Sequence, residues 1–104
     1  LNPPTEINMF ELLSLKDEIN SITGNIINFE KLRGAIKDAK PEIIIHMAAQ
    51  SLVRESYKDP VLTYETNVMG TVNILEAMRQ VNGIKVLLNI TSDKCYENRD
   101  WLWR

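Results

Sequence analysis

Residues 85–96, reading KVLLNITSDKCY, constrain the fold most, because an apolar run passes there directly into a polar cluster. An apolar run this short, entered from an Asn-Gly pair, predicts a strand buried on both faces of a parallel sheet. The polar cluster of Ser92, Asp93 and Lys94 would then lie at the carboxyl end of that strand, where ligands bind in open α/β sheets. Considered alone, these residues favour a plainer interpretation, in which Ser92 and Asp93 cap a turn and Lys94 is solvated.

Helix and strand patterns alternate along the rest of the chain. Thr5 is expected to cap a short amphipathic helix, and residues 19–23 have the pattern of a weak strand. Asn28 suits the N-cap of a second helix, which ends before Pro41. Residues 43–45, three isoleucines, form the clearest strand pattern. Strand–helix alternation of this kind predicts an α/β fold with a parallel, doubly wound sheet.

Residues 59–81 predict one long helix. Asp59 supplies a capping carboxylate, Pro60 occupies the first helical position, and Gly83 follows the end of the helix. Gly70, inside the helix, indicates a close approach to the helix backbone. The residues predicted to face the sheet are Tyr64, Val68, Thr71, Val72, Leu75 and Met78. The residues predicted to flank that stripe are Leu62, Thr66, Met69 and Asn73.

Composition narrows the range of functions. With 104 residues and 44% hydrophobic content, the chain suffices for one small domain. Its net charge of −2, with both signs interspersed, predicts no nucleic-acid or membrane partner. No apolar run approaches the ~20 residues of a membrane span. The single Cys95 cannot form an internal disulfide, which favours a cytoplasmic location, and one histidine beside one cysteine makes a metal site unexpected.

Three motifs together carry a family resemblance: HMAAQSLVRESY at 46–57, NVMGTVNILEA at 67–77 and ITSDKCYENR at 90–99. In this order and spacing they resemble the extended short-chain dehydrogenase/reductase superfamily, in its nucleotide-sugar dehydratase and epimerase branch. Within that branch the Asp-Lys pair after Ser92 resembles the CDP-glucose 4,6-dehydratases, since the related dTDP-glucose dehydratases carry Asp-Glu there. The resemblance implies a Rossmann-like, three-layer parallel sheet, present as an incomplete middle portion of three strands and about three helices.

The resemblance also implies a reaction and roles for the polar cluster. NAD would oxidise a nucleotide-linked sugar at C4, water would leave across C5–C6, and the hydride would return to C6. Ser92 corresponds to the hydroxyl that hydrogen-bonds the C4 oxygen. Asp93 corresponds to the acid that protonates the departing C6 hydroxyl, and Lys94 stands where a base would take the C5 proton. An adjacent acid and base suit one elimination, because neither partner has to diffuse to the site.

Cofactor contacts follow from the same resemblance. The residues that it assigns to NAD are Asn25, Ile26, Ala48, Ala49, Gln50, Asn67, Ile90 and Thr91. Ala48 and Ala49 correspond to small residues that let the backbone approach the dinucleotide, and Asn67 to a helix residue that orders the site. Asn25 stands where a Gly-Asp-Ile element has an aspartate that accepts from the adenine amino group, so the acceptor here carries no charge. His46 is expected to be structural.

Residues 1–104 are expected to be a central part of one NAD-binding domain, because they hold neither a glycine-rich phosphate loop nor a Tyr-x-x-x-Lys motif. In the Rossmann strand order, residues 43–47 and 85–90 would be direct neighbours. The fragment alone is expected to be inactive. Three interpretations remain open: a nucleotide-sugar dehydratase, an epimerase of the same superfamily, or a non-catalytic Rossmann-like binding module. The resemblance further implies a homodimer, or a higher homo-oligomer, formed through the long helix. The residues expected at that interface are the flanking set Leu62, Thr66, Met69 and Asn73.

Overall fold

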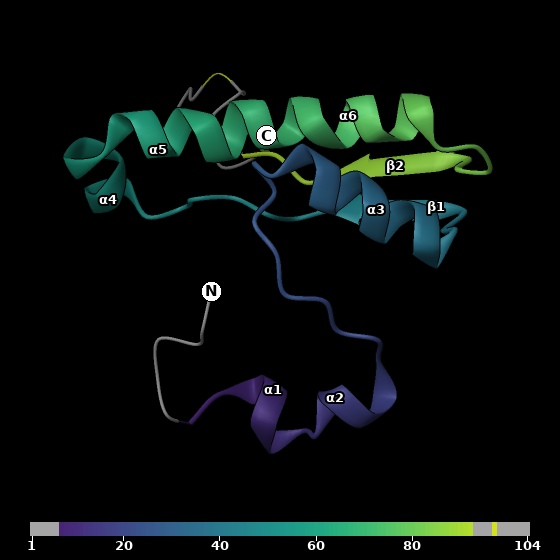
Figure 1. The fold of residues 1–104 in the computed structure, drawn as a ribbon. Coiled ribbons are helices and arrows are strands. Elements are labelled where there is room, and N and C mark those ends of the chain that lie inside the picture. Colours follow the sequence, from purple (N-terminus) through teal and green to yellow (C-terminus); the bar gives the residue numbers. More distant parts are fainter. Residues whose placement is uncertain (1–6, 93–96, 98–104) are drawn as a thin grey trace.

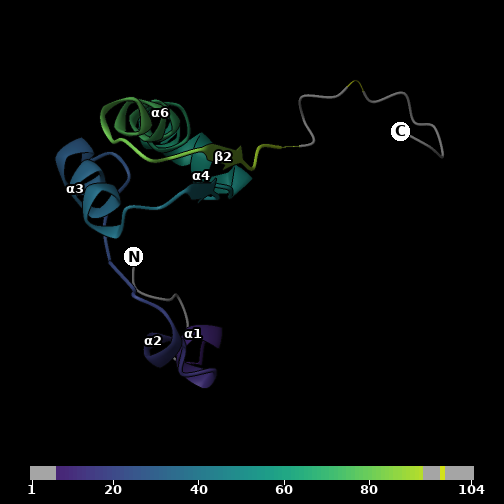
Figure 2. The same cartoon turned by 90° about the vertical axis from the view of Figure 1, so that its right-hand side faces the viewer.

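The computed structural model describes residues 7–92 and residue 97. One long helical rod, formed by α5 (Pro60–Tyr64), the π-helical segment η1 (Glu65–Met69) and α6 (Gly70–Gln80), runs along a two-stranded sheet. Helix α3 (Phe29–Ala39) lies on the same side of the sheet as α6, and the opposite side carries no helix within the described residues (Figures 1 and 2). The short helices α1 (Met9–Leu12) and α2 (Leu15–Glu18) are set apart from this unit.

The sheet pairs β1 (Ile43–His46) with β2 (Val86–Asn89) in parallel, with Ile43 opposite Val86 and His46 opposite Asn89. The predicted pairing of neighbours is therefore confirmed. The prediction of a strand buried on both faces is wrong for the described residues, because α3 and α6 cover one face only. Ile44 and Leu87 face the core, whereas Ile43 and Leu88 remain 60% and 50% exposed.

The expected strand at residues 19–23 is not formed, so the sheet has two strands among the described residues rather than three. A strand needs a neighbour to satisfy its backbone N–H and C=O groups, and no described strand runs beside this segment. Its isoleucines, Ile19 and Ile22, are exposed.

The first helix also differs from expectation. Thr5 lies outside the described residues, and Asn8 caps α1, its Oδ1 accepting from Glu11 N at 3.1 Å. A left-handed Ser14, with φ of 48°, then separates α1 from α2. A non-glycine residue in that region is costly in a helix interior. The predicted short helix is therefore reduced to the single turn of α1, and α2 is a separate turn that was not predicted.

Local capping signals place the two longer helices where they were predicted. Asn28 Oδ1 accepts from Lys31 N at 3.1 Å at the start of α3. Asp59 Oδ1 accepts from Leu62 N at 2.9 Å at the start of α5, with Pro60 in the first turn. Gly83, with φ of +100°, turns the chain from α6 into β2. Each signal depends on residues within one turn of the cap.

The core lies where α3, α6 and the sheet meet, and its buried apolar side chains are Ile36, Ile74 and Ala77. The stripe predicted to face the sheet is therefore wrong in large part, since Val68, Val72 and Leu75 are 45–52% exposed. Two causes act together. The π turn of η1 holds more residues than an α turn and shifts the register of the faces, and α3 selects the face that carries Gly70, Ile74 and Ala77.

Asn73, predicted to flank the stripe, faces the protein instead. Its Nδ2 donates to the backbone oxygens of Ile26 and Ile27, at 3.0 and 3.1 Å. The same contact region explains Gly70, because a Cβ there would stand 2.7 Å from Ile26 Cγ2. The predicted close approach at Gly70 is confirmed.

The two helical glycines allow a matched stability prediction in the full-length protein. Gly34→Ala, in α3, meets no atom within 4 Å and should stabilise the fold by about 0.5–1 kcal/mol through helix propensity. Gly70→Ala gains the same propensity but pushes Ile26, a β-branched side chain with little freedom, and should destabilise by about 1–3 kcal/mol. Urea unfolding of both variants measures the difference in their free energies of unfolding. Equal changes in the two variants would show that the Ile26 side chain moves aside at no cost.

Candidate active site at the carboxyl ends of the strands

The carboxyl ends of β1 and β2 meet at one edge of the sheet. Ile90 N donates to His46 O at 3.0 Å, which joins the segments that leave the two strands. Ala48 and Ala49 follow β1, Ile90 and Thr91 follow β2, and all four are exposed. In Figure 1 both segments leave the sheet toward the end of the molecule that holds α4 (Val53–Lys58). The structure thus brings these predicted residues to one open edge.

The proposed acid–base pair has no described geometry, because Asp93 and Lys94 lie outside the described residues. Ser92 is the last described residue of the segment after β2, and it is exposed beside Thr91. The hydroxyl predicted to contact the sugar therefore lies on the same edge as Ala48 and Ala49.

Asn67 binds the loop after β1 through a reciprocal pair of hydrogen bonds. Gln50 N donates to Asn67 Oδ1 at 2.7 Å, and Asn67 Nδ2 donates to Gln50 O at 3.0 Å. A carboxamide in this orientation substitutes for a neighbouring strand, because it satisfies both backbone groups of one residue. The loop that carries Ala48 and Ala49 is thereby joined to η1, seventeen residues along the chain.

His46 continues this polar contact toward the core. It is 5% exposed, and its Nε2 lies 3.1 Å from Thr71 Oγ1. The Thr71 hydroxyl donates its only proton to Asn67 O at 2.7 Å, so it accepts from His46, and the imidazole carries a proton on Nε2. The hydroxyl also hydrogen-bonds the Asn67 carbonyl oxygen beside the π turn, where it competes with backbone N–H groups for that acceptor. Such competition slightly destabilises and often bends a helix. His46 is structural, as the sequence predicted.

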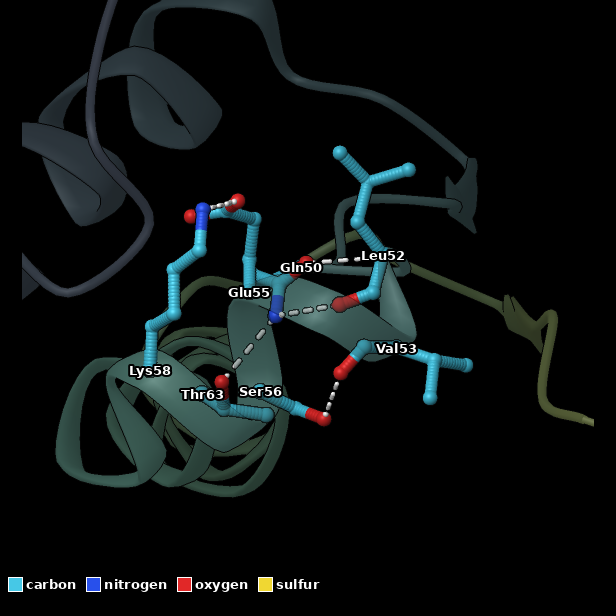
Figure 3. Close-up of polar contacts among 7 residues, drawn as sticks. All are labelled: Gln50, Leu52, Val53, Glu55, Ser56, Lys58 and Thr63. Carbon is cyan, nitrogen blue, oxygen red and sulfur yellow. Dashed lines mark hydrogen bonds and ion pairs between the residues drawn. The ribbon is translucent and has the colours of Figure 1, made fainter.

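The side chain of Gln50 is bonded within the protein (Figure 3). Its Oε1 accepts from Leu52 N at 2.6 Å. Its Nε2 donates to Leu52 O at 3.2 Å and to Thr63 Oγ1 at 3.0 Å. Since the backbone N–H is bonded to Asn67, every N–H of Gln50 is used inside the chain. Gln50 can therefore support a cofactor site through the backbone it holds in place, and it has no free donor for the cofactor itself.

Asn25 and Ile26 lie just before α3, on a segment that packs against the long helix. Asn25 Oδ1 accepts from Ile27 N at 3.1 Å and closes a turn before α3. Ile26 packs against Gly70, which lies three positions after Asn67 on the rod. No described hydrogen bond joins this pair to the residues after β1 or β2. Arg54 and Tyr57, on α4, are exposed, as the solvated alternative predicted.

Two hydroxyls that hold this region together were not predicted from the sequence, those of Thr63 and Thr71. With Asn67 they recur every four residues along the rod, so they share one side of it. Polar residues at this spacing, bordering the buried Ile74 and Ala77, were a usable signal. The signal is weak because Thr71 also fits the apolar stripe predicted to face the sheet.

Comparison with known proteins identifies the family. The sequence profile of the family described as GDP-mannose 4,6 dehydratase matches residues 5–100. The chain belongs to the GDP-mannose 4,6 dehydratase family. A CDP-glucose 4,6-dehydratase of Salmonella typhimurium is 56% identical over 99% of this chain, and the match covers 29% of that relative. A UDP-glucose 4-epimerase of Mycolicibacterium smegmatis is 34% identical over 73% of the chain and 24% of its own length. The predicted resemblance is confirmed.

A solved structure of this fold is similar in three dimensions. The UDP-glucose-4-epimerase of Stenotrophomonas maltophila, solved with bound NAD and formylated UDP-arabinopyranose, superposes with a TM-score of 0.70 at 24% identity, over 80% of this chain and 24% of its own. The predicted fold class, an incomplete α/β portion, is confirmed. Residues 7–92 and 97 contain no helix long and apolar enough to cross a membrane and no cluster of three metal-ligating side chains.

Proposed function

We propose that the protein to which this chain belongs is an NAD-dependent nucleotide-sugar 4,6-dehydratase that converts CDP-glucose to CDP-4-keto-6-deoxyglucose. The observation that carries the proposal is the 56% identity to a CDP-glucose 4,6-dehydratase over 99% of the chain. We infer that residues 1–104 are part of a single NAD-binding domain. The cytoplasmic location favoured by the lone Cys95 is part of the proposal.

The residues at the strand ends suit a dinucleotide. Ala48 and Ala49 are exposed and carry only a methyl group each, so a ligand can approach the backbone after β1. Asn67 holds that backbone by both polar groups of Gln50. The proposed cofactor edge consists of these residues with Ile90 and Thr91, while Asn25 and Ile26 serve the adenine end. When bound, NAD would accept the C4 hydride and later return it to C6.

Residues of this chain would assist the oxidation and carry out the elimination of water. Ser92 would hydrogen-bond the C4 oxygen and hold the sugar while C4 is oxidised. A carbonyl at C4 acidifies the C5 hydrogen, which Lys94, as a neutral amine, would remove. Asp93 would protonate the C6 hydroxyl, so that the electrons of the C5–H bond form the C5–C6 double bond and water departs. Lys94 would return its proton to C5 when the hydride adds to C6, and the proton released from the C4 hydroxyl during oxidation would balance the one that Asp93 gives to the departing water.

Incubation of the full-length protein with CDP-glucose and NAD tests the function directly. NMR should detect a 4-keto-6-deoxy sugar with loss of one water. Formation of a C4 epimer that retains the C6 hydroxyl would assign the protein to the epimerases, and binding without turnover would assign it to non-catalytic modules.

Asn25 allows a test of the proposed adenine contact. Its Oδ1 already accepts from Ile27 N, and the side chain that would meet the adenine amino group is an uncharged amide. Asn25→Asp would keep one oxygen for Ile27 and give the second, charged oxygen to the amino group. We expect NAD to bind the full-length variant about tenfold more tightly, because charge-assisted hydrogen bonds are the stronger kind. Calorimetry with nicotinamide hypoxanthine dinucleotide, which has a carbonyl in place of the amino group, is the control. An equal gain for both dinucleotides would refute the contact.

The exposed side of the long helix supports a homodimer. We define its outer face as Val61, Tyr64, Val68, Val72 and Leu75, all of them exposed. Beside this face lies a hollow of about 430 Å³ lined by residues that include Val61, Tyr64, Val68 and Met69. An apolar stripe of this length on a helix is typical of a surface buried against a partner. The proposed partner is a second copy of the same protein. The interface predicted from sequence consisted of the flanking set Leu62, Thr66, Met69 and Asn73. The outer face defined here does not include Thr66 and Asn73.

A further inference from the structure

We propose that Gln50 is a positioning residue that sets one wall of the substrate site, by holding the start of α4 against α5. The proposal rests on the proposed function, since the substrate is taken to be CDP-glucose. It concerns the side chain of Gln50, whose contacts join three segments: the loop after β1, the N-cap residue of α4 and the first turns of the long rod (Figure 3).

Helix α4 depends on this side chain for its beginning. Leu52 is the N-cap residue of α4 and makes no side-chain cap hydrogen bond, because leucine has no polar atom to offer. Gln50 compensates from two positions upstream, with Oε1 on Leu52 N and Nε2 on Leu52 O. A helix of six residues has little stability of its own, so the conformation of Leu52 determines where α4 starts.

The second amide proton of Gln50 joins α4 to the rod. It is donated to Thr63 Oγ1, and Thr63 in turn donates to Asp59 O at 2.9 Å. Asp59 lies between α4 and α5: its N–H is bonded to Glu55 O and its carboxylate caps α5. Gln50 and Thr63 are both partly buried, which strengthens their hydrogen bond relative to one in water. One carboxamide thus determines the angle at which α4 leaves the loop.

The position of α4 explains why the contact between Gln50 and Thr63 would affect substrate binding. The loop that starts at the carboxyl end of β1 carries Ala48 and Ala49 and ends at α4. Figure 1 shows α4 on the side of the molecule toward which both strands point. A substrate at this edge meets the wall formed by α4. Displacing that wall should weaken substrate binding while leaving the reacting groups after β2 in place.

Thr63 provides the cleanest variant, because it touches Gln50 and lies on the rod rather than at the edge. In the full-length enzyme, Thr63→Val removes the hydroxyl at constant shape and should raise the KM for CDP-glucose about five- to tenfold, with kcat within about twofold. Thr63→Ser keeps the hydroxyl and should restore the wild-type KM. Ser56→Ala is the matched control, since Ser56 Oγ bonds only to Val53 O within α4, at 2.7 Å.

Gln50→Met deletes all three side-chain hydrogen bonds and should raise KM further. Adding Thr63→Val to it should have a smaller effect than Thr63→Val has alone, because the shared contact is already gone and only the bond from Thr63 to Asp59 O remains to be lost. Hydrogen exchange of the same full-length variants supplies a readout that needs no substrate: amides of residues 52–58 should exchange faster in Gln50→Met than in wild type. If residues 52–58 of Gln50→Met exchange their amide hydrogens at the wild-type rate, the proposal is overturned whether or not CDP-glucose is the substrate. Failure of wild-type enzyme to convert CDP-glucose overturns the proposed function alone. A Thr63→Val enzyme with unchanged KM, or a Thr63→Ser enzyme as impaired as Thr63→Val, would show that α4 is held by other means.

Discussion

Lys94→Met in the full-length enzyme should lower the rate of water elimination by about 10²–10⁴-fold, the usual effect of losing one positioned base. Methionine keeps similar bulk and leaves Ser92 and Asp93 in place. Oxidation at C4 does not require this base, so NADH should still form from bound NAD when CDP-glucose is added. Exchange of the C5 hydrogen with D2O should fall with elimination. Stopped-flow absorbance of NADH and NMR of the C5 position measure the two steps separately.

Asp93→Asn is the control that separates the acid from the base. It removes the proposed proton donor for the C6 hydroxyl and leaves the amine of Lys94, so C5 exchange should continue while water loss slows. If Lys94→Met eliminates water at the wild-type rate, Lys94 is a solvated residue of a turn, which is the plainer interpretation of the polar cluster. The base would then have to be sought elsewhere in the protein.

If the full-length protein is the proposed homodimer, Val68→Glu with Leu75→Glu should convert it to monomers. Both residues belong to the outer face and are about half exposed, so a monomer tolerates the carboxylates without strain. A dimer would bury both charges beside apolar side chains, at several kcal/mol each, which raises the dissociation constant about 1,000-fold or more. Sedimentation velocity across a range of protein concentrations measures the shift.

Val68→Ile with Leu75→Met, which keeps the same positions apolar, is the matched control and should leave the dimer intact. Leu62→Glu with Met69→Glu tests the remaining members of the flanking set predicted from sequence, and it should have the smaller effect. A dimer that survives the Val68 and Leu75 carboxylates would assign the outer face to another part of the same protein.

Local chemistry explains what the sequence alone determined. The starts of α3 and α5 were predictable because Asn28 and Asp59 bond to N–H groups three residues away. The two strands were predictable from short runs of β-branched and other apolar residues. Gly70 was predictable as a close approach, because glycine is unfavourable in a helix interior unless something requires its small size. The family was recognisable because three motifs keep their order and spacing.

Only the tertiary structure decided the features that need a partner from elsewhere in the chain. Residues 19–23 are not a strand, because strand pairing requires a neighbour that their own pattern cannot supply. The buried face of the long helix was decided by Ile26 and α3 and by the π turn of η1, which alters the register that an ideal helix would have. Gln50 lies in the motif at 46–57, where the family resemblance assigns it a contact with the cofactor. Its side chain nevertheless bonds to Thr63, thirteen positions away, and a hydrogen bond across that distance exists only once α4 and α5 have folded against each other.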